Sequence, residues 1–363
     1  MSFPPLLNPH DTTRELVDLN QKILKGIENL SRIRKQDIQV GASPKEEIYR
    51  EENVVLYHYT PMVDKPFRVP VLIVYALVNR PYMVDLQEDR SLVRNLLKLG
   101  MDVYLIDWGY PGRGDRWLTL DDYINGYIDN CVDVVSKRHG ADKINVLGIC
   151  QGGTISLCYT ALHPEKVKNL ITMVTPVDFH VNEGMPNLWA GCDAGAPGMD
   201  VDALVDAFGN IPGEFMNLGF LMMKPFQLGI GKYLEMIDIL DNEEKLQNFL
   251  RMEEWIFDSP DQAGETYRQF MKDFYQGNKL IKGEVKIGAH LVDLRKIQLP
   301  VLNIFAEQDH LVPPPSSIAL KEHVGSTDYT VKSFPVGHIG MYVSGKVQRD
   351  LPPLIADWLK QRV

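Results

Sequence analysis

The segment Gly148-Ile149-Cys150-Gln151-Gly152-Gly153 carries the clearest chemical signal in the sequence. It follows an apolar run typical of a strand and precedes a stretch typical of a helix, which is the context of a nucleophile elbow. Glycines on both sides of the cysteine permit the close backbone approach that such a sharp turn requires. The cysteine would stand at a helix N-terminus, where the dipole favours a thiolate. We therefore predict that Cys150 is a nucleophile.

Two further residues could complete a catalytic triad. Asp309 follows the apolar run 301–305, and His338 lies in the loop 335–340, after the last expected strand. The chain order of nucleophile, acid and base is that of α/β-hydrolases. Taken singly, the three could be a buried cysteine beside helix-start glycines, a loop-capping aspartate and a surface histidine. Their joint occurrence, in order and in context, favours a Cys-His-Asp triad.

The expected oxyanion hole consists of two backbone N–H groups. One belongs to Gln151, directly after the nucleophile, and the other to Val78, in the loop that follows the expected strand 69–75. The other cysteines fit structural roles better. Cys131 lies on the apolar stripe of a helix, and Cys158 lies on the helix behind the elbow.

The chain around these residues alternates between apolar strands and amphipathic helices. Strands are expected at 54–59, 69–75, 101–107, 144–148, 167–174, 301–305 and 330–334, and helices at 11–33, 90–99, 119–135, 152–162 and 354–360. Apolar strands that alternate with helices predict a mostly parallel sheet with helices on both faces, here an α/β-hydrolase fold. The amphipathic helix at 11–33 either packs on its own core or docks on a partner or surface.

The alternation stops at Thr175-Pro176, and the following 115 or so residues are rich in helix formers, Met and Phe. This stretch is expected to be an inserted helical cap or lid over the site. The expected division is therefore an N-terminal helical segment at 1–40, the first part of the core at 41–176, the cap at 177–295 and the second part of the core at 296–363.

Composition excludes several classes of protein. The chain has 363 residues and a formal net charge of −10, so it lacks the basic character of a nucleic-acid binder. Its four cysteines are too scattered for a disulfide framework or a CxxC metal site. No signal peptide and no apolar run near the ~18 residues of a membrane span is present. We expect a soluble cytoplasmic enzyme without a metal or cofactor.

Several motifs together resemble the catalytic subunit of polyhydroxyalkanoate synthases. They extend over residues 40–345 and read GICQGG, YALVNRPYMVDL, LIDWGYPG, WIFDSPDQAGETYRQF, FAEQDHLVPP and FPVGHIG. The chain length resembles that of the two-component synthases of classes III and IV. Within these, the N-terminal region and the PDQAGE stretch look more like class III than class IV.

The resemblance implies polymerisation of (R)-3-hydroxyacyl-CoA, typically 3-hydroxybutyryl-CoA, with release of CoA. Cys150 would carry the growing chain as a thioester, and His338 would deprotonate Cys150. Asp309 would either orient His338 or activate the 3-hydroxyl of the incoming monomer. Asp258 and Asp261 are further candidates for a direct role, with helix capping as the alternative.

The resemblance also implies partners and a location. The second synthase subunit would be of the PhaE type rather than the PhaR type, the catalytic subunit would form a homodimer, and the enzyme would associate with polyester granules in the cytoplasm.

Two other functions remain open at this point. A Cys-dependent hydrolase, such as a thioesterase or a dienelactone-hydrolase-like enzyme, would use the same triad with water as acceptor. A non-enzymatic binding module would retain the fold alone, although the complete Cys, Asp and His set argues against it. Release of CoA with insoluble polyester, rather than free 3-hydroxybutyrate, would separate the polymerase from the hydrolase.

Overall fold

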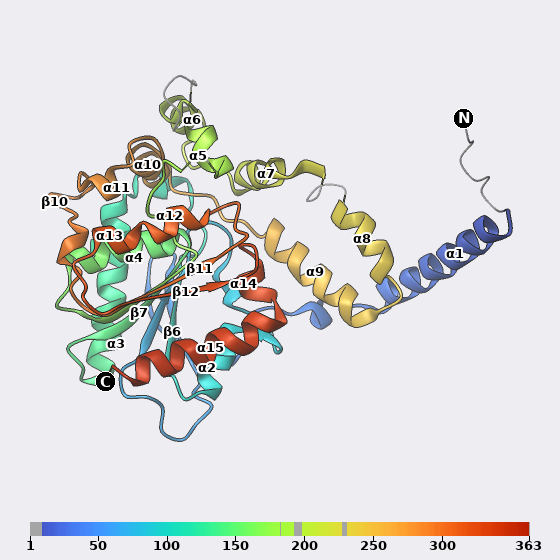
Figure 1. The fold of residues 1–363 in the computed structure, drawn as a ribbon, viewed down its shortest axis with the longest axis horizontal. Coiled ribbons are helices and arrows are strands. Elements are labelled where there is room, and N and C mark those ends of the chain that lie inside the picture. The colour runs from blue at the N-terminus through green and yellow to red at the C-terminus, as the bar shows by residue number, and fades with distance from the viewer. Residues whose placement is uncertain (1–8, 182, 192–197, 227–230, 363) are drawn as a thin grey trace. The chain divides into compact units, whose positions relative to one another are not determined.

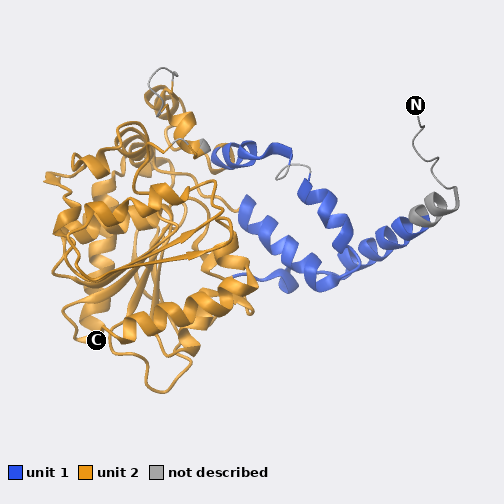
Figure 2. Ribbon diagram, viewed as in Figure 1, with its two compact units in different colours: residues 1–40, 216–257 blue, residues 41–215, 258–363 orange. Residues whose placement is uncertain are grey.

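The computed structural model describes residues 9–181, 183–191, 198–226 and 231–362. The chain divides into two compact units (Figure 2). The helical unit comprises residues 1–40 and 216–257, and the core unit comprises residues 41–215 and 258–363. This division differs from the four consecutive segments expected from the sequence, because 216–257 groups with the N-terminal segment rather than with the remainder of 177–295.

The core unit contains an eight-stranded sheet in the order β1-β2-β6-β3-β7-β8-β11-β12. All neighbouring strands from β6 to β12 are parallel, whereas β2 is antiparallel to both β1 and β6. The central strands β3 and β7 are buried along their whole length. The strands are β1 Lys45–Glu51, β2 Val54–Tyr59, β3 Val71–Val74, β6 Val103–Asp107, β7 Ile144–Ile149, β8 Val167–Met173, β11 Val301–Ala306 and β12 Tyr329–Phe334.

Helices cover both faces of this sheet (Figure 1). On one face α2 (Leu92–Lys98) packs beside α15 (Gly345–Lys360), and on the other face lie α3 (Asp129–His139) and α4 (Gln151–Leu162). A π-helical segment, η4 (Asp122–Ile128), leads directly into α3. The expectation of a mostly parallel sheet with helices on both faces is confirmed.

Two elements differ from the sequence expectation. Strand β1 was not expected. This edge strand consists mostly of charged residues, and none of its positions is fully buried. Helix α15 begins well before residue 354 and passes through Pro352 and Pro353. Pro352 lacks the N–H that would bond to the Gln348 carbonyl. That carbonyl instead accepts a 3.4 Å hydrogen bond from Asn95 Nδ2, which helps to explain why the helix continues.

The region expected as a cap is largely helical. In the core unit its helices are α5 Met185–Ala190, α6 Val201–Phe208, α10 Gly264–Gln269, η6 Phe270–Gln276 and α11 Lys279–Lys282. Helix α7 (Gly213–Met223) crosses into the helical unit, which also contains α8 (Lys232–Ile239), α9 (Glu243–Phe257), η1 (Lys35–Ile38) and α1 (Pro9–Arg32). Within the helical unit, Gly26 of α1 contacts Leu240, whose carbonyl accepts a 2.8 Å hydrogen bond from Asn29 Nδ2.

The remaining short elements connect these layers. They are η2 Pro81–Val84, β4 Asp85–Gln87, β5 Arg90–Ser91, η3 Arg113–Trp117, β9 Lys286–Ile287, β10 His290–Leu291, η7 Leu294–Lys296, α12 Pro314–Ile318, α13 Leu320–His323 and α14 Gly340–Val343.

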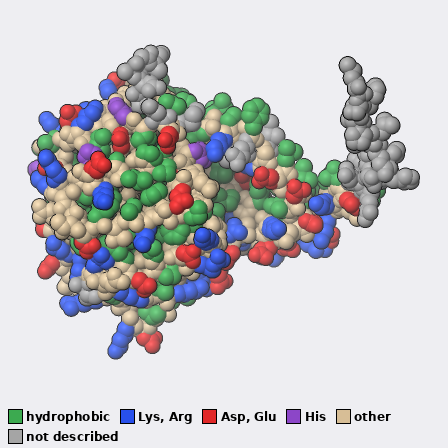
Figure 3. Space-filling view, in the orientation of Figure 1, with side chains coloured by type: hydrophobic (Ala, Val, Ile, Leu, Met, Phe, Trp, Pro, Cys, Tyr) green, Lys and Arg blue, Asp and Glu red, His purple; other side chains and the backbone are tan. Residues whose placement is uncertain are grey.

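Charged side chains of both signs are interspersed on the face that Figure 3 shows, so no broad region of one sign dominates it. Among the described residues, the helices are all too short or too polar to cross a lipid bilayer.

Candidate active site

Cys150 lies on a strained turn between β7 and α4, with φ 55° and ψ −126°. The turn is possible because its neighbours are glycines. A Cβ on Gly152 would lie 2.3 Å from the carbonyl oxygen of Val74, and a Cβ on Gly148 would lie 2.6 Å from the Cα of Gly153. Such contacts are too short for any side chain, so this backbone requires glycine at both positions. The elbow geometry expected from the sequence is therefore present around Cys150.

His338 and Asp309 form a buried pair. The imidazole Nδ1 lies 2.7 Å from Asp309 Oδ2. The other carboxylate oxygen, Oδ1, accepts hydrogen bonds from the backbone N–H groups of Leu311 and Val312, each at 2.9 Å. The Asp309 side chain has no exposed surface, and His338 is 6% exposed. Asp309 is thus held rigidly, and its orientation determines that of the imidazole.

The environment of His338 favours its protonated form. Burial alone would lower the pKa of His338, but the charges of Asp309 and Cys150, together with hydrogen bonds to both, raise it well above the usual 6.5. The structure therefore brings Cys150, His338 and Asp309 together, with a protonated imidazole favoured at His338.

The two expected oxyanion-hole residues lie on segments that are directly connected. Gln151 is the first residue of α4, so its N–H has no intrahelical acceptor. Its side-chain Oε1 accepts a 3.1 Å hydrogen bond from the N–H of Leu77, next to Val78. The Gln151 side chain therefore fixes the loop after β3 against the elbow, a connection that the sequence did not reveal.

Three tyrosines surround the site and were not expected from the sequence. The rings of Tyr75 and Tyr342 meet edge to face, with centroids 6.2 Å apart, and Tyr342 is also 6.2 Å from the His338 ring. The hydroxyls of Tyr75 and Tyr342 share a hydrogen bond. Burial, followed by the charge of Cys150, raises the pKa of both Tyr75 and Tyr275. These hydroxyls remain protonated at neutral pH and provide a neutral lining near the thiol.

Asp258 and Asp261 are placed where the chain returns from the helical unit. Asp258 accepts hydrogen bonds from the hydroxyls of Tyr82 at 3.0 Å and Tyr110 at 2.6 Å. Asp261 Oδ1 accepts a 3.0 Å hydrogen bond from the N–H of Gly213, where the chain leaves the core unit at the start of α7. Both carboxylates therefore have anchoring contacts at the base of the inserted segment.

The other described cysteines are unsuited to nucleophilic attack. Cys131 and Cys158 are fully buried. Burial raises the pKa of the Cys131 thiol, and raises that of Cys158 to about 12. Cys192 lies outside the described residues. Among the residues described, no three His, Cys, Asp or Glu side chains gather in a way that could hold a metal ion.

Comparisons with known proteins agree on the fold. Residues 69–344 match the family model of the alpha/beta hydrolase fold, and residues 14–96 match that of the poly-beta-hydroxybutyrate polymerase (PhaC) N-terminus. A putative lipase from Sulfolobus solfataricus superposes with a TM-score of 0.55 at 15% identity, covering 88% of this chain and 99% of the lipase. A hydrolase from Pseudomonas aeruginosa gives 0.54 at 14% identity, with coverage of 88% and 99%.

Relatives at higher identity share one name, "Poly(3-hydroxyalkanoate) polymerase subunit PhaC". The protein from Synechocystis is 64% identical, covering 97% of this chain and 93% of its own length. That from Allochromatium vinosum is 56% identical, with coverage of 99% and 100%. A longer protein from Cupriavidus necator is 30% identical over 73% of this chain and 46% of its own length. With its α/β-hydrolase fold, the chain belongs to the family of poly(3-hydroxyalkanoate) polymerase PhaC subunits.

Proposed function

We propose that this chain is the catalytic subunit of a two-component, class III polyhydroxyalkanoate synthase, which polymerises (R)-3-hydroxyacyl-CoA, first of all 3-hydroxybutyryl-CoA, and releases CoA. The observation that carries this proposal is the cysteine elbow beside the His338–Asp309 pair, in a chain 64% identical to a polymerase subunit. The two-component type is supported by length, because the chain matches 93–100% of two polymerase subunits but 46% of a longer relative.

In the first step, the sulfur of Cys150 attacks the thioester carbonyl of the monomer while the proton that the pair shares is held on His338. The oxyanion that develops is stabilised by the N–H groups of Gln151 and Val78. Collapse breaks the carbon–sulfur bond to CoA, and the departing sulfur takes the proton from His338. Cys150 then carries the acyl group as a thioester. Because the two sulfurs are of similar basicity, the free-energy change of this acyl transfer is close to zero.

In the second step, the 3-hydroxyl of another monomer attacks the acyl thioester on Cys150. His338 accepts the hydroxyl proton as the new carbon–oxygen bond forms, and it returns that proton to the sulfur of Cys150 as the thioester breaks. The product is an ester-linked acyl-CoA that is one unit longer. It can acylate Cys150 again with loss of CoA, so repetition of the two steps builds the polyester without any cofactor.

Asp309 acts in this scheme by orienting His338. The alternative, direct activation of the substrate hydroxyl, is disfavoured by the buried carboxylate and by the occupation of both its oxygens. An acyl thioester must also be protected from water. The partly buried Tyr275 comes from the inserted region, and the charge of Cys150 contributes to its raised pKa, which supports a covering role for part of residues 177–295.

The partner proposals follow the family. The second subunit is of the PhaE type rather than the PhaR type, the catalytic subunit forms a homodimer, and the enzyme acts in the cytoplasm at the surface of polyester granules.

The test is an assay with (R)-3-hydroxybutyryl-CoA that measures CoA release and recovers the product, with and without a PhaE-type partner. We expect insoluble polyester in an amount that matches the CoA released. Cys150→Ala should abolish both polymer and acyl-enzyme, whereas Cys158→Ser should retain activity and serves as the matched control. Free 3-hydroxybutyrate as the main product would identify a hydrolase and refute the proposal.

A further inference from the structure

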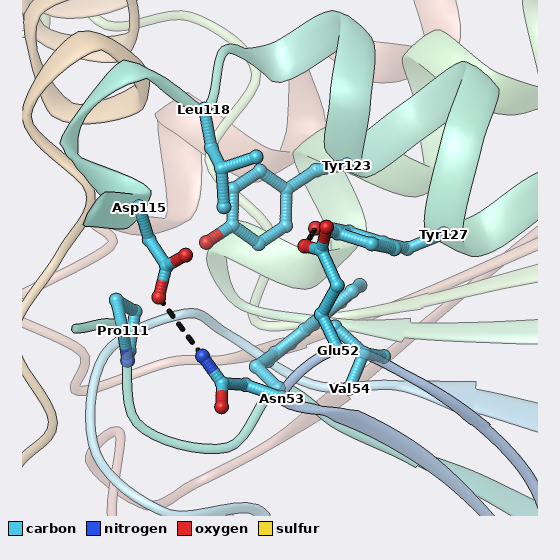
Figure 4. A pocket seen from close by; sticks show the side chains of 9 residues that line it. Glu52, Asn53, Val54, Pro111, Asp115, Leu118, Tyr123 and Tyr127 are labelled. Atoms are coloured by element: carbon cyan, nitrogen blue, oxygen red, sulfur yellow. Dashed lines mark hydrogen bonds between the residues drawn. The ribbon is translucent and has the colours of Figure 1, made fainter.

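A small cavity lies beside the hairpin that joins β1 to β2 (Figure 4), and its lining does not include Cys150, His338 or Asp309. Glu52 and Asn53 of the hairpin and Asp115 of η3 line its mouth. Trp108, Tyr123 and Tyr127 are all at least 94% buried and line its interior. The enclosed space is of the order of a single water molecule, so the cavity suits a small ligand.

The interior of this cavity is an aromatic cage. The rings of Trp108 and Tyr123 have centroids 5.5 Å apart and meet at 69°, and those of Tyr123 and Tyr127 are 5.5 Å apart at 79°. In an edge-to-face pair the edge of one ring covers one face of its neighbour and leaves the neighbour's other face uncovered by that ring. The negative face of an aromatic ring attracts cations.

Two carboxylates at the mouth are held in fixed orientations by neighbours. Tyr127 donates its hydroxyl to Glu52 Oε2. Asp115 Oδ2 accepts hydrogen bonds from Asn53 Nδ2 at 2.8 Å and from the N–H of Gly112 at 2.6 Å. Each carboxylate thus uses one oxygen for these contacts, which leaves Glu52 Oε1 and Asp115 Oδ1 for a ligand.

The hydroxyl of Tyr123 is the observation that points to a ligand. Its side chain lies among the cavity residues with the hydroxyl directed toward the Asp115 side (Figure 4). Tyr123 is only 3% exposed. None of the hydrogen bonds found among the described residues uses this hydroxyl, so it can bond to a group in the cavity. A ligand in the cavity would supply one.

Carboxylates give the largest charge effects on the cage tyrosines. Burial and the carboxylates of Asp115, Asp122 and Glu52 raise the pKa of Tyr123. The same holds for Tyr127, where burial, Glu52 and Glu51 act in the same direction. A cation would relieve this unbalanced negative potential. Two carboxylates and one hydroxyl provide fewer oxygens than the six or more that Ca²⁺ or Mg²⁺ takes, whereas aromatic faces attract weakly hydrated monovalent cations.

We propose that the cage of Trp108, Tyr123 and Tyr127, closed by Glu52 and Asp115, is a binding site for a monovalent cation of potassium size, K⁺ or ammonium. The carboxylate oxygens and the Tyr123 hydroxyl oxygen face the cation, and the rings contribute cation–π attraction. Trp108 also donates its Nε1–H to the carbonyl of Tyr75 at 3.0 Å, which links the cage to the strand end beside Cys150.

The test compares thermal unfolding of the full chain in chlorides of K⁺, NH₄⁺ and tetramethylammonium at equal concentration. Tetramethylammonium is too large for the cavity and controls for ionic strength. We expect K⁺ or NH₄⁺ to raise the midpoint by about 1–2 °C with millimolar saturation. The ion with the lower half-saturation concentration is the one that the cavity prefers. Soaking crystals in rubidium chloride should give an anomalous peak between Glu52 and Asp115.

Glu52→Gln keeps an oxygen for Tyr127 but removes the charge, and should abolish the ion-dependent shift. The matched control Glu51→Gln neutralises the adjacent carboxylate outside the cavity and should retain the shift. Tyr123→Phe should weaken the saturation several-fold. Equal midpoints in all three salts, together with no rubidium peak, would mean that the cavity holds water alone and would overturn the proposal. These readouts do not depend on polymerase activity.

Discussion

Both oxygens of the Asp309 carboxylate are engaged, one with His338 and the other with two backbone N–H groups. Asp309→Asn should therefore impair the imidazole in every step that uses it. We expect acylation of Cys150 and elongation to fall by a similar factor, roughly a thousandfold or more. Single-turnover labelling of Cys150 and steady-state polymerisation measure the two steps. A variant that loads Cys150 at the normal rate but fails to elongate would instead assign Asp309 to the substrate hydroxyl.

The charge on His338 depends on its two anionic neighbours. Because Asp309 and Cys150 raise its pKa against the effect of burial, removal of either should lower it, with the larger fall in Asp309→Asn. NMR titration of the His338 ring measures this directly. The pair stabilises the fold in full below the unfolded-state pKa of about 6.5, and this contribution is lost as the pH rises through the raised pKa. An unchanged titration in Cys150→Ala would show that the two side chains do not interact.

At the residue scale, the strained turn at Cys150 and the pairing of His338 with Asp309 could be predicted because their signals are local. Glycines bracket Cys150, and Asp309 and His338 each follow a recognisable strand. Tyr75 and Tyr342 could not be predicted in the same way. They resemble ordinary core residues in the sequence, and only folding brings two distant segments into contact.

At the scale of elements, the loop after β3 is fixed to the start of α4 by the Gln151 side chain. Gln151→Met preserves length but removes the acceptor for the Leu77 N–H. We expect the acylation rate to fall about tenfold, less than the loss of an oxyanion donor itself. Gln151→Glu, which retains an acceptor oxygen, is the matched control. Equal rates in wild type and Gln151→Met would show that the loop holds its position without this bond.

Asp258 anchors the segment that follows α9, because its carboxylate accepts hydrogen bonds from the hydroxyls of Tyr82 and Tyr110. Asp258→Ala should lower the free energy of unfolding by about 1–2 kcal/mol, because two hydroxyls lose their acceptor. Single-turnover acylation of Cys150 should remain near normal. Chemical denaturation and thioester labelling measure the two effects. Complete loss of acylation in a folded variant would restore Asp258 as a catalytic candidate.

Two buried elements have nearly the bounds expected from the sequence. The expected strand 54–59 has the bounds of β2, and the helix expected at 152–162 differs from α4 by one residue. Edge strand β1 was missed because its exposed polar residues lack the apolar run of a buried strand. The start of α15 was missed because proline normally ends a helix, and the compensating Asn95 lies far away in the sequence.

At the scale of the whole molecule, a polymerase has three conflicting requirements. It must admit a CoA thioester, exclude water and release an apolar chain. We expect residues 177–290 to cover the site in the isolated subunit and to move for turnover, with a PhaE-type partner binding the active arrangement more tightly. The subunit alone should show a lag in CoA release, which the partner removes, with a parallel change in proteolysis of these residues. Full initial rate without a lag, and unchanged proteolysis, would refute this gating.

The division into units could not be predicted from periodicity. Helices α1 and α8 are each amphipathic, and nothing in either pattern indicates that Gly26 meets Leu240. The contact depends on a glycine that allows close approach of a partner more than 200 positions away, as the hydrogen bond from Asn29 to the same residue shows. Patterns within one helix report which face is buried, but not which distant helix covers it.

Ile211 and Gln262 pair as an isolated antiparallel bridge, with two 2.9 Å backbone hydrogen bonds. The ends of the intervening chain are therefore held together whatever lies between them. The free-energy cost of closing the loop between these ends depends only weakly on loop length, and it rises by about 0.6 kcal/mol for each doubling of that length. Changes in the length of residues 212–261 should therefore leave the strands and the elbow of the core unit in place.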